Sequence, residues 1–157
     1  MIEEGKKAPN FTLPATNGGK IKLSELQGSP VVLYFYPKDA TPGCTTEACD
    51  FRDYHGDFEK LGVKVLGMSA DPMKAHEKFS EKHELPFPLV SDEEKKTLEK
   101  YGVWQEKKMY GKTFMGIVRS TVIIDENGKV VKVWPKVKVK GHVEEVLDVV
   151  RNLVSAG

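Results

Sequence analysis

The stretch Val31-Val32-Leu33-Tyr34-Phe35-Tyr36 is the part of the sequence from which the fold can be argued. Such a continuous apolar and aromatic run is typical of a strand that is buried on both faces of a partly parallel sheet. A helix is predicted to follow over 42–61, with Thr41 as a candidate N-cap, Pro42 at the first helical position and Gly62 just beyond its end. Together they predict the first central unit of an α/β fold.

Strands and helices are predicted to alternate after this unit. Phe51, Tyr54 and Phe58 recur at the spacing of one helical face, so the first helix has an apolar side. The later predicted elements are a strand over 63–69, a helix over 72–83 opened by Asp71, a helix over about 92–101, an antiparallel hairpin of 117–125 with 130–134, and a helix over 141–154. The last helix is expected to pack on the sheet through Val143, Val146, Leu147, Val150 and Val154.

Before the central unit, residues 11–13 and 21–23 alternate around the turn signal Thr16-Asn17-Gly18-Gly19, which predicts a hairpin that covers one edge of the sheet. The sequence contains no internal repeat, low-complexity tract or linker, so residues 1–157 are expected to form one domain. Parallel crossovers followed by a hairpin and a helix predict an α/β sandwich of the thioredoxin type. We expect a central mixed sheet, flanking helices and an N-terminal β-hairpin.

Charge and hydropathy exclude several classes of function. Lys and Arg number 24 against 23 Asp and Glu, a formal charge of +1, so no nucleic-acid partner is indicated. No apolar run approaches the roughly 20 residues of a membrane span, and the first residues lack the pattern of a signal peptide. We therefore expect a cytoplasmic protein that does not bind a membrane. In a reducing compartment two nearby cysteines are more often catalytic, redox-sensing or metal-binding than structural.

Both cysteines lie just after the central strand, where open α/β sheets bind ligands. Cys44 falls in the first turn of the predicted helix. The unpaired N–H groups and the positive end of the helix dipole favour its thiolate there, so Cys44 is predicted to be a nucleophile. Gly43 lets a substrate approach the backbone closely, and Thr41 can direct its hydroxyl into the same loop.

The spacing of Cys44 and Cys49 excludes a simple redox pair. Five residues on an ideal helix correspond to about 140° of rotation, about 7.5 Å of rise and a Cα separation of about 8.6 Å. A disulfide needs Cα atoms within roughly 7 Å, so it cannot span this distance. Either the two thiols never pair, or the first turns of the helix unwind when they do.

Two alternatives assign the cysteines no nucleophilic or disulfide chemistry. Both cysteines could be small buried residues without reactivity. A metal site is disfavoured because two thiols supply half of a tetrahedral shell and the four histidines are scattered, so we expect no metal. The histidines are His55, His76, His83 and His142.

Four segments resemble the peroxiredoxins, and within them the bacterioferritin comigratory protein or peroxiredoxin Q group. Pro37-x-x-x-Thr41-x-x-Cys44 is similar to the active-site signature, and Gly43-Cys44-Thr45-x-Glu47-Ala48-Cys49 resembles the subgroup with a resolving cysteine five residues downstream. Phe114-x-Gly116-Ile117-x-Arg119-Ser120-Thr121 is similar to the strand that carries the family's active-site arginine. From Ala8-Pro9-Asn10-Phe11 to the last helix, the resemblance spans nearly the whole chain.

The resemblance implies a role for each site residue. Cys44 would attack the peroxide, Cys49 would resolve the product, and Arg119 would position and polarise the peroxide while supporting the thiolate. Thr41 would hydrogen-bond a peroxide oxygen, and Pro42 would shield the thiolate from water. Gly43 and Pro37 complete the implied substrate-binding positions. For Pro37 alone, a structural role is the favoured interpretation.

The implied activity is reduction of hydrogen peroxide and organic hydroperoxides through a Cys44 sulfenic acid, which Cys49 converts to an intramolecular disulfide. Thioredoxin or a glutaredoxin-like protein would reduce that disulfide. No metal or organic cofactor is needed, and a monomer can complete the cycle because both cysteines belong to one chain. The rival hypotheses are a general thiol–disulfide oxidoreductase, which the missing Cys-x-x-Cys pair disfavours, and a non-enzymatic redox-sensing binding module.

Overall fold

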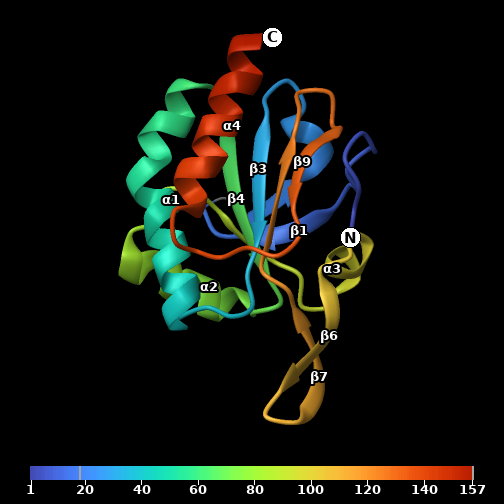
Figure 1. Ribbon diagram of the computed structural model, residues 1–157. Coiled ribbons are helices and arrows are strands. Elements are labelled where there is room, and N and C mark those ends of the chain that lie inside the picture. The colour runs from blue at the N-terminus through green and yellow to red at the C-terminus, as the bar shows by residue number, and fades with distance from the viewer. Residues whose placement is uncertain (18, 157) are drawn as a thin grey trace.

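A seven-stranded mixed sheet with helices on both faces forms the body of the computed structural model, which describes residues 1–17 and 19–156 (Figure 1). The strand order is β2-β1-β5-β4-β3-β8-β9. The strand bounds are β1 (Thr12–Ala15), β2 (Gly19–Lys22), β3 (Val31–Phe35), β4 (Lys64–Ser69), β5 (Leu89–Ser91), β8 (Ser120–Ile124) and β9 (Val130–Trp134). The helices are the 3₁₀ helix η1 (Leu23–Leu26), α1 (Pro42–Lys60), α2 (Met73–His83), α3 (Lys96–Lys100) and α4 (His142–Ala156).

Strand β3 lies inside the sheet, as its apolar sequence predicts. It pairs in parallel with β4 and antiparallel with β8, so the expected mixed sheet is confirmed. All five β3 residues are buried because alternate side chains enter two different cores. Val32 and Tyr34 pack under α1, α2 and α4, whereas Leu33 and Phe35 pack on the face covered by η1 and α3.

The predicted N-terminal hairpin is confirmed. Strands β1 and β2 pair antiparallel with Leu13 opposite Ile21, and β2 forms one edge of the sheet. Gly18, part of the predicted turn, lies outside the described residues. The hairpin joins the sheet through Ala15, which pairs with Val90 of β5.

Helix α1 begins at Pro42, as predicted, and ends at Lys60, one residue before the predicted end. Phe51 and Phe58 are fully buried, and Tyr54 packs against the same core, so the predicted apolar face is confirmed. Gly62 follows the helix with a φ of 72°, a conformation that glycine adopts without strain. The N-cap prediction is wrong in one respect, because the Thr41 hydroxyl donates to the Lys38 carbonyl at 2.8 Å instead of capping α1.

Two helix starts differ from the prediction. Helix α2 begins at Met73, and the Asp71 carboxylate accepts hydrogen bonds from the Asp39 N–H and the Ser69 hydroxyl instead of capping the helix. Helix α3 covers only Lys96–Lys100, shorter than the predicted 92–101. Lys95 has a φ of 65°, so the chain before α3 follows a left-handed turn that interrupts the helix.

A hairpin that the sequence did not predict projects from the body, formed by β6 (Trp104–Met109) and β7 (Lys112–Ile117) (Figure 1). Tyr110 and Gly111, with φ of 52° and 76°, form its turn, and both angles suit a tight hairpin connection. The predicted strand over 117–125 is wrong at its start, because Ile117 ends β7 and β8 begins at Ser120. The predicted antiparallel pairing of this segment with 130–134 is confirmed for β8 and β9.

Helix α4 packs on α1, next to which it lies in Figure 1. Val143, Val146, Leu147 and Val150 are buried as predicted, but Val154 is exposed because the last turn extends past the sheet core.

Among the described residues, no helix combines the length and the apolar character that a membrane span requires.

Gly67 provides a test of how tightly β4 packs. A Cβ at this position would lie 2.8 Å from Tyr34 Cζ and 3.0 Å from Leu89 Cδ2. We predict that Gly67→Ala lowers the free energy of unfolding by about 1–3 kcal/mol through overpacking. Gly56→Ala is the matched control, because Gly56 lies within α1 and its added methyl would have no atom within 4 Å apart from its chain neighbours and the backbone of its own helix. This change should stabilise the protein by about 0.5–1 kcal/mol. Urea denaturation followed by circular dichroism measures both, and a Gly67→Ala protein as stable as the wild type would contradict the packing described.

Candidate active site

Cys44 is the third residue of α1 and only 1% exposed. The strand-to-helix connection over 36–41 places it beyond the carboxyl end of β3, as the sequence predicts. Its Sγ lies 3.3 Å from Nη2 of Arg119, which donates a hydrogen bond to it. The Arg119 guanidinium and the N-terminus of α1 therefore both direct positive charge toward this sulfur.

Sheet pairing brings Arg119 to this point from 75 residues away. In the antiparallel pairing of β3 with β8, Phe35 lies opposite Ser120. The residue that precedes β8 is therefore adjacent to the loop that follows β3. Arg119 occupies the short connection between β7 and β8, so it lies outside the strand to which the sequence resemblance assigned it.

Glu47 is the second partner of Arg119. Its Oε1 accepts a hydrogen bond from Nη1 at 2.7 Å, and the Glu47 side chain is fully buried. Burial raises the pKa of Glu47 to about 7, although the charge of Arg119 and its hydrogen bond act in the opposite direction. Its Oε2 has no hydrogen-bond partner among residues 1–17 and 19–156.

The sequence interpretation quoted Glu47 as part of a motif but gave it no role. The signal that could have identified it is its spacing, three residues after Cys44 and four before Phe51. This spacing puts a carboxylate on the inward face of the helix, beside the nucleophile. A carboxylate in such a place needs a cationic partner.

Gly43 makes room for the guanidinium. A Cβ at this position would lie 3.0 Å from Nη2 of Arg119, closer than most side-chain contacts allow. The glycine predicted to admit a substrate therefore also permits the approach of Arg119 to the start of α1. Its contact with a substrate stays a prediction.

The other predicted site residues surround the same loop. Thr41 is half-buried, and its carbonyl accepts the N–H of Thr45 in the first turn of α1. Pro42 is exposed at the first helical position, and Pro37 is half-buried just after β3. The structure thus brings the signature residues to one end of β3, while their contacts with a peroxide stay predictions.

Cys49 lies on the same uninterrupted helix as Cys44, and both are free thiols in the described part of the chain. It is half-buried, and its Sγ lies 3.8 Å from Nδ1 of His83 at the end of α2. The helical path between the two cysteines is the geometry from which the Cα separation of about 8.6 Å was calculated. This helix therefore keeps the two cysteines apart.

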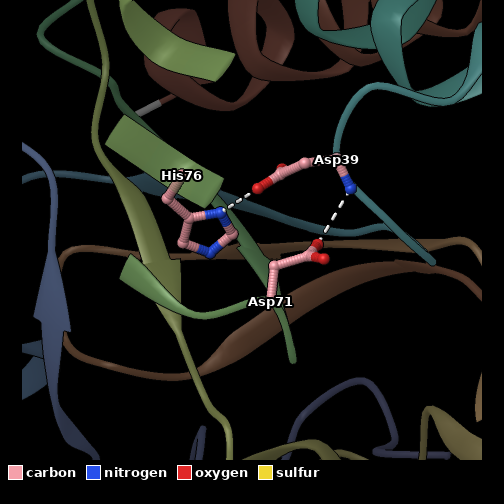
Figure 2. Close-up of side chains that lie close together, drawn as sticks. All are labelled: Asp39, Asp71 and His76. Carbon is pink, nitrogen blue, oxygen red and sulfur yellow. Dashed lines mark hydrogen bonds and ion pairs between the residues drawn. The ribbon is translucent and has the colours of Figure 1, made fainter. Parts of the chain in front are cut away.

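A buried hydrogen-bond network anchors the loop before Cys44 (Figure 2). Asp39 Oδ2 pairs with His76 Nδ1 at 2.6 Å, and its Oδ1 accepts the Tyr36 hydroxyl at 2.6 Å. The Asp39 N–H donates to Asp71 Oδ2 at 2.8 Å, which ties the loop to the connection between β4 and α2. The remaining ring nitrogen of His76 pairs with the Val90 carbonyl.

Asp39, Asp71 and His76 lie close enough to share a cation, with their nearest N and O atoms within 4.8 Å of one another. These atoms already bind one another, the neighbouring backbone and the Tyr36 and Ser69 hydroxyls. Hydrogen bonding therefore accounts for the cluster, and we interpret it as an anchor for the loop.

The family model described as AhpC/TSA matches residues 4–133 of the chain. Peroxiredoxin Bcp of Bacillus subtilis (strain 168) is 52% identical, with 97% of each chain covered, and Peroxiredoxin Bcp of Escherichia coli (strain K12) is 43% identical, with 94% of each covered. A solved structure of the Xanthomonas campestris bacterioferritin comigratory protein superposes with a TM-score of 0.88. It comes from work on the alkyl peroxide reduction activity of that protein. It is 43% identical and covers 92% of both chains.

These matches confirm the thioredoxin-like fold expected from the sequence, and the similarity extends through nearly the whole chain. They also confirm the resemblance first seen in the cysteine motif. The chain therefore belongs to the AhpC/TSA family, within which it is a peroxiredoxin of the Bcp and Q group.

Proposed function

We propose that this thiol peroxidase uses Cys44 as its peroxidatic nucleophile. The observation that carries the proposal is the contact of Arg119 Nη2 with Cys44 Sγ at 3.3 Å, at the N-terminus of α1. The thiolate attacks one peroxide oxygen, the O–O bond breaks, and the other oxygen leaves as water or an alcohol after protonation. Cys44 is thereby oxidised to a sulfenic acid.

Arg119 acts on both charges of this step. Its guanidinium stabilises the thiolate and, in the transition state, the negative charge that develops on the leaving oxygen. Glu47 holds the guanidinium from the other side, through Nη1. The planar, multidentate shape of arginine allows both contacts at once, which a lysine cannot reproduce.

The signature residues complete the proposed peroxide site. The Thr41 hydroxyl already donates to Lys38, so toward a peroxide it would act as an acceptor of the O–H group. Gly43 would admit the peroxide to the backbone, and Pro42 would limit access of water to the sulfur. Pro37 would support the loop.

The chain acts on a hydroperoxide and draws electrons from a thiol, as peroxiredoxins do. In the finer scheme that we propose, hydrogen peroxide and organic hydroperoxides are both substrates, consistent with the alkyl peroxide activity of the Xanthomonas relative. Cys49 condenses with the Cys44 sulfenic acid, and thioredoxin or a glutaredoxin-like protein reduces the disulfide by exchange.

We further propose that residues 1–157 work as one domain and as a cytoplasmic monomer, because one copy carries both cysteines of the cycle. A general thiol–disulfide oxidoreductase or a redox-sensing module would have no use for a buried Arg119–Glu47 pair beside the nucleophile. Peroxide consumption separates these alternatives from a peroxidase.

The first functional prediction assigns the two cysteines. Cys44→Ser should abolish peroxide reduction, while Cys49→Ser should react once and stop at a sulfenic acid that dimedone traps, because Arg119 contacts only the first of the two sulfurs in the described structure. Peroxide consumption and mass spectrometry of the dimedone adduct measure the two outcomes. Multiple turnover by Cys44→Ser would overturn the assignment.

The second prediction concerns the cost of burying Glu47. Its pKa rises from 4.5 to about 7 on folding, so its ionisation costs no stability below about pH 4.5 and the full amount above about pH 7. As the pH rises from about 5 to about 8, the free energy of unfolding of the wild type should therefore fall by roughly 2–3 kcal/mol relative to that of Glu47→Gln. Urea denaturation at both pH values measures the difference, and a constant offset between the two proteins would contradict it.

The third prediction concerns the disulfide state. Because a Cα separation of about 8.6 Å exceeds the bridging limit of roughly 7 Å, the oxidised protein should lose helix between Pro42 and Phe51. Hydrogen exchange of reduced and oxidised protein, with the Cys44–Cys49 bond verified by peptide mapping, tests this. The buried Phe58 segment is the internal control and should stay equally protected in both states. Equal protection of 42–51 would contradict the unwinding.

A further inference from the structure

The thiol of Cys49 has a neighbour whose chemistry the peroxide step does not use. Nδ1 of His83 lies 3.8 Å from its Sγ, within the reach of a hydrogen bond to the large sulfur atom. A neutral imidazole with its proton on Nε2 offers Nδ1 as an acceptor for the S–H group. The pair is thus arranged for transfer of a proton from sulfur to nitrogen.

Two contacts hold the histidine in place. Its ring packs edge-on against Phe79, with ring centroids 5.0 Å apart, and Phe79 is buried. Its carbonyl accepts a hydrogen bond at 3.0 Å from Nη1 of Arg52, three residues after Cys49 on α1. The end of α2 is therefore fixed against the turn of α1 that carries the second thiol.

Cys49 lacks the features that activate Cys44. It is the eighth residue of α1, beyond the first turn in which the helix dipole acts. Arg119 is occupied by Cys44 and Glu47. A neutral thiol is a poor nucleophile, so attack on a sulfenic acid requires that its proton be removed.

We propose that His83 is the general base of the resolving step, an inference that rests on the peroxidase cycle proposed above. The S–H bond of Cys49 breaks and its proton passes to Nδ1 of His83. The sulfur then bonds to Sγ of the Cys44 sulfenic acid, whose S–O bond breaks, and the departing hydroxide takes a proton to become water. Cys49 is oxidised and Cys44 is reduced to the common disulfide.

The same contacts determine which cysteine moves. Phe51 is fully buried and stacks on Tyr34, with the two ring centroids 4.5 Å apart. Because Arg52 is also bound to the end of α2, α1 is held in place just after Cys49. At the other end, Ala40 has a left-handed φ of 63° immediately after the anchored Asp39, and the Thr41 hydroxyl does not cap the helix. The first turn therefore opens and carries Cys44 to a Cys49 that stays beside its base.

Single-turnover kinetics test the role of His83. We expect His83→Ala to form the Cys44 sulfenic acid at the wild-type rate but to form the disulfide roughly tenfold or more slowly. His83→Asn, which keeps a polar side chain without a basic nitrogen, should be equally slow, and added imidazole should restore His83→Ala. Rapid quenching with dimedone or N-ethylmaleimide, followed by mass spectrometry, measures both steps.

His55→Ala is the matched control, because His55 lies on the same helix as Cys49 but packs against Phe87. It should resolve at the wild-type rate. Slow resolution should also raise the yield of Cys44 sulfinic acid at excess peroxide in both His83 variants. A wild-type rate of disulfide formation in both His83 variants would overturn the general-base role, whereas failure of the wild type to form a sulfenic acid would overturn the proposed peroxidase cycle instead.

Discussion

The guanidinium of Arg119 lies between two groups that water does not reach, the carboxylate of Glu47 and the sulfur of Cys44. Ionising either group in such a place is costly unless an opposite charge lies beside it. Burial lowers the pKa of Arg119, and the neighbouring Glu47 and Cys44 more than offset it, so the guanidinium stays charged. The guanidinium thus makes a negative charge tolerable on both the carboxylate and the sulfur, and each of these groups in turn stabilises the guanidinium.

This arrangement depends on the sheet. Because β3 and β8 are neighbours and antiparallel, the loop after β3 and the residue before β8 meet at one end of the sheet. The loop is fixed through Asp39 to the connection between β4 and α2, and Gly43 leaves space where the guanidinium meets α1. Topology, a hydrogen-bonded anchor and a missing Cβ together place one cation at the first turn of one helix.

Hydropathy and turn patterns in the sequence predicted the strands and helices that build this site. The side-chain contacts that the sequence did not predict join residues that lie far apart in the chain. The apolar run of β3, the turn of the first hairpin and the apolar face of α1 are encoded within a few residues. The contact of Arg119 with Glu47 joins residues 72 positions apart, so only a resemblance could indicate the arginine. Asp71 was predicted to open α2, but tertiary contacts decide which N–H or O–H group donates to a carboxylate. The β6–β7 hairpin was missed because its turn lacks the Asn-Gly or Asp-Gly signal.

The central claim is that Glu47 serves the peroxide step by holding Arg119. A double-mutant cycle on the rate constant of sulfenic acid formation, with Glu47→Gln, Arg119→Ala and both changes together in the Cys49→Ser background, tests it most directly. If Glu47 acts through the guanidinium, the double variant should react no more slowly than Arg119→Ala alone. Losses that multiply, so that the double variant is slower by the product of the two single effects, would contradict the account.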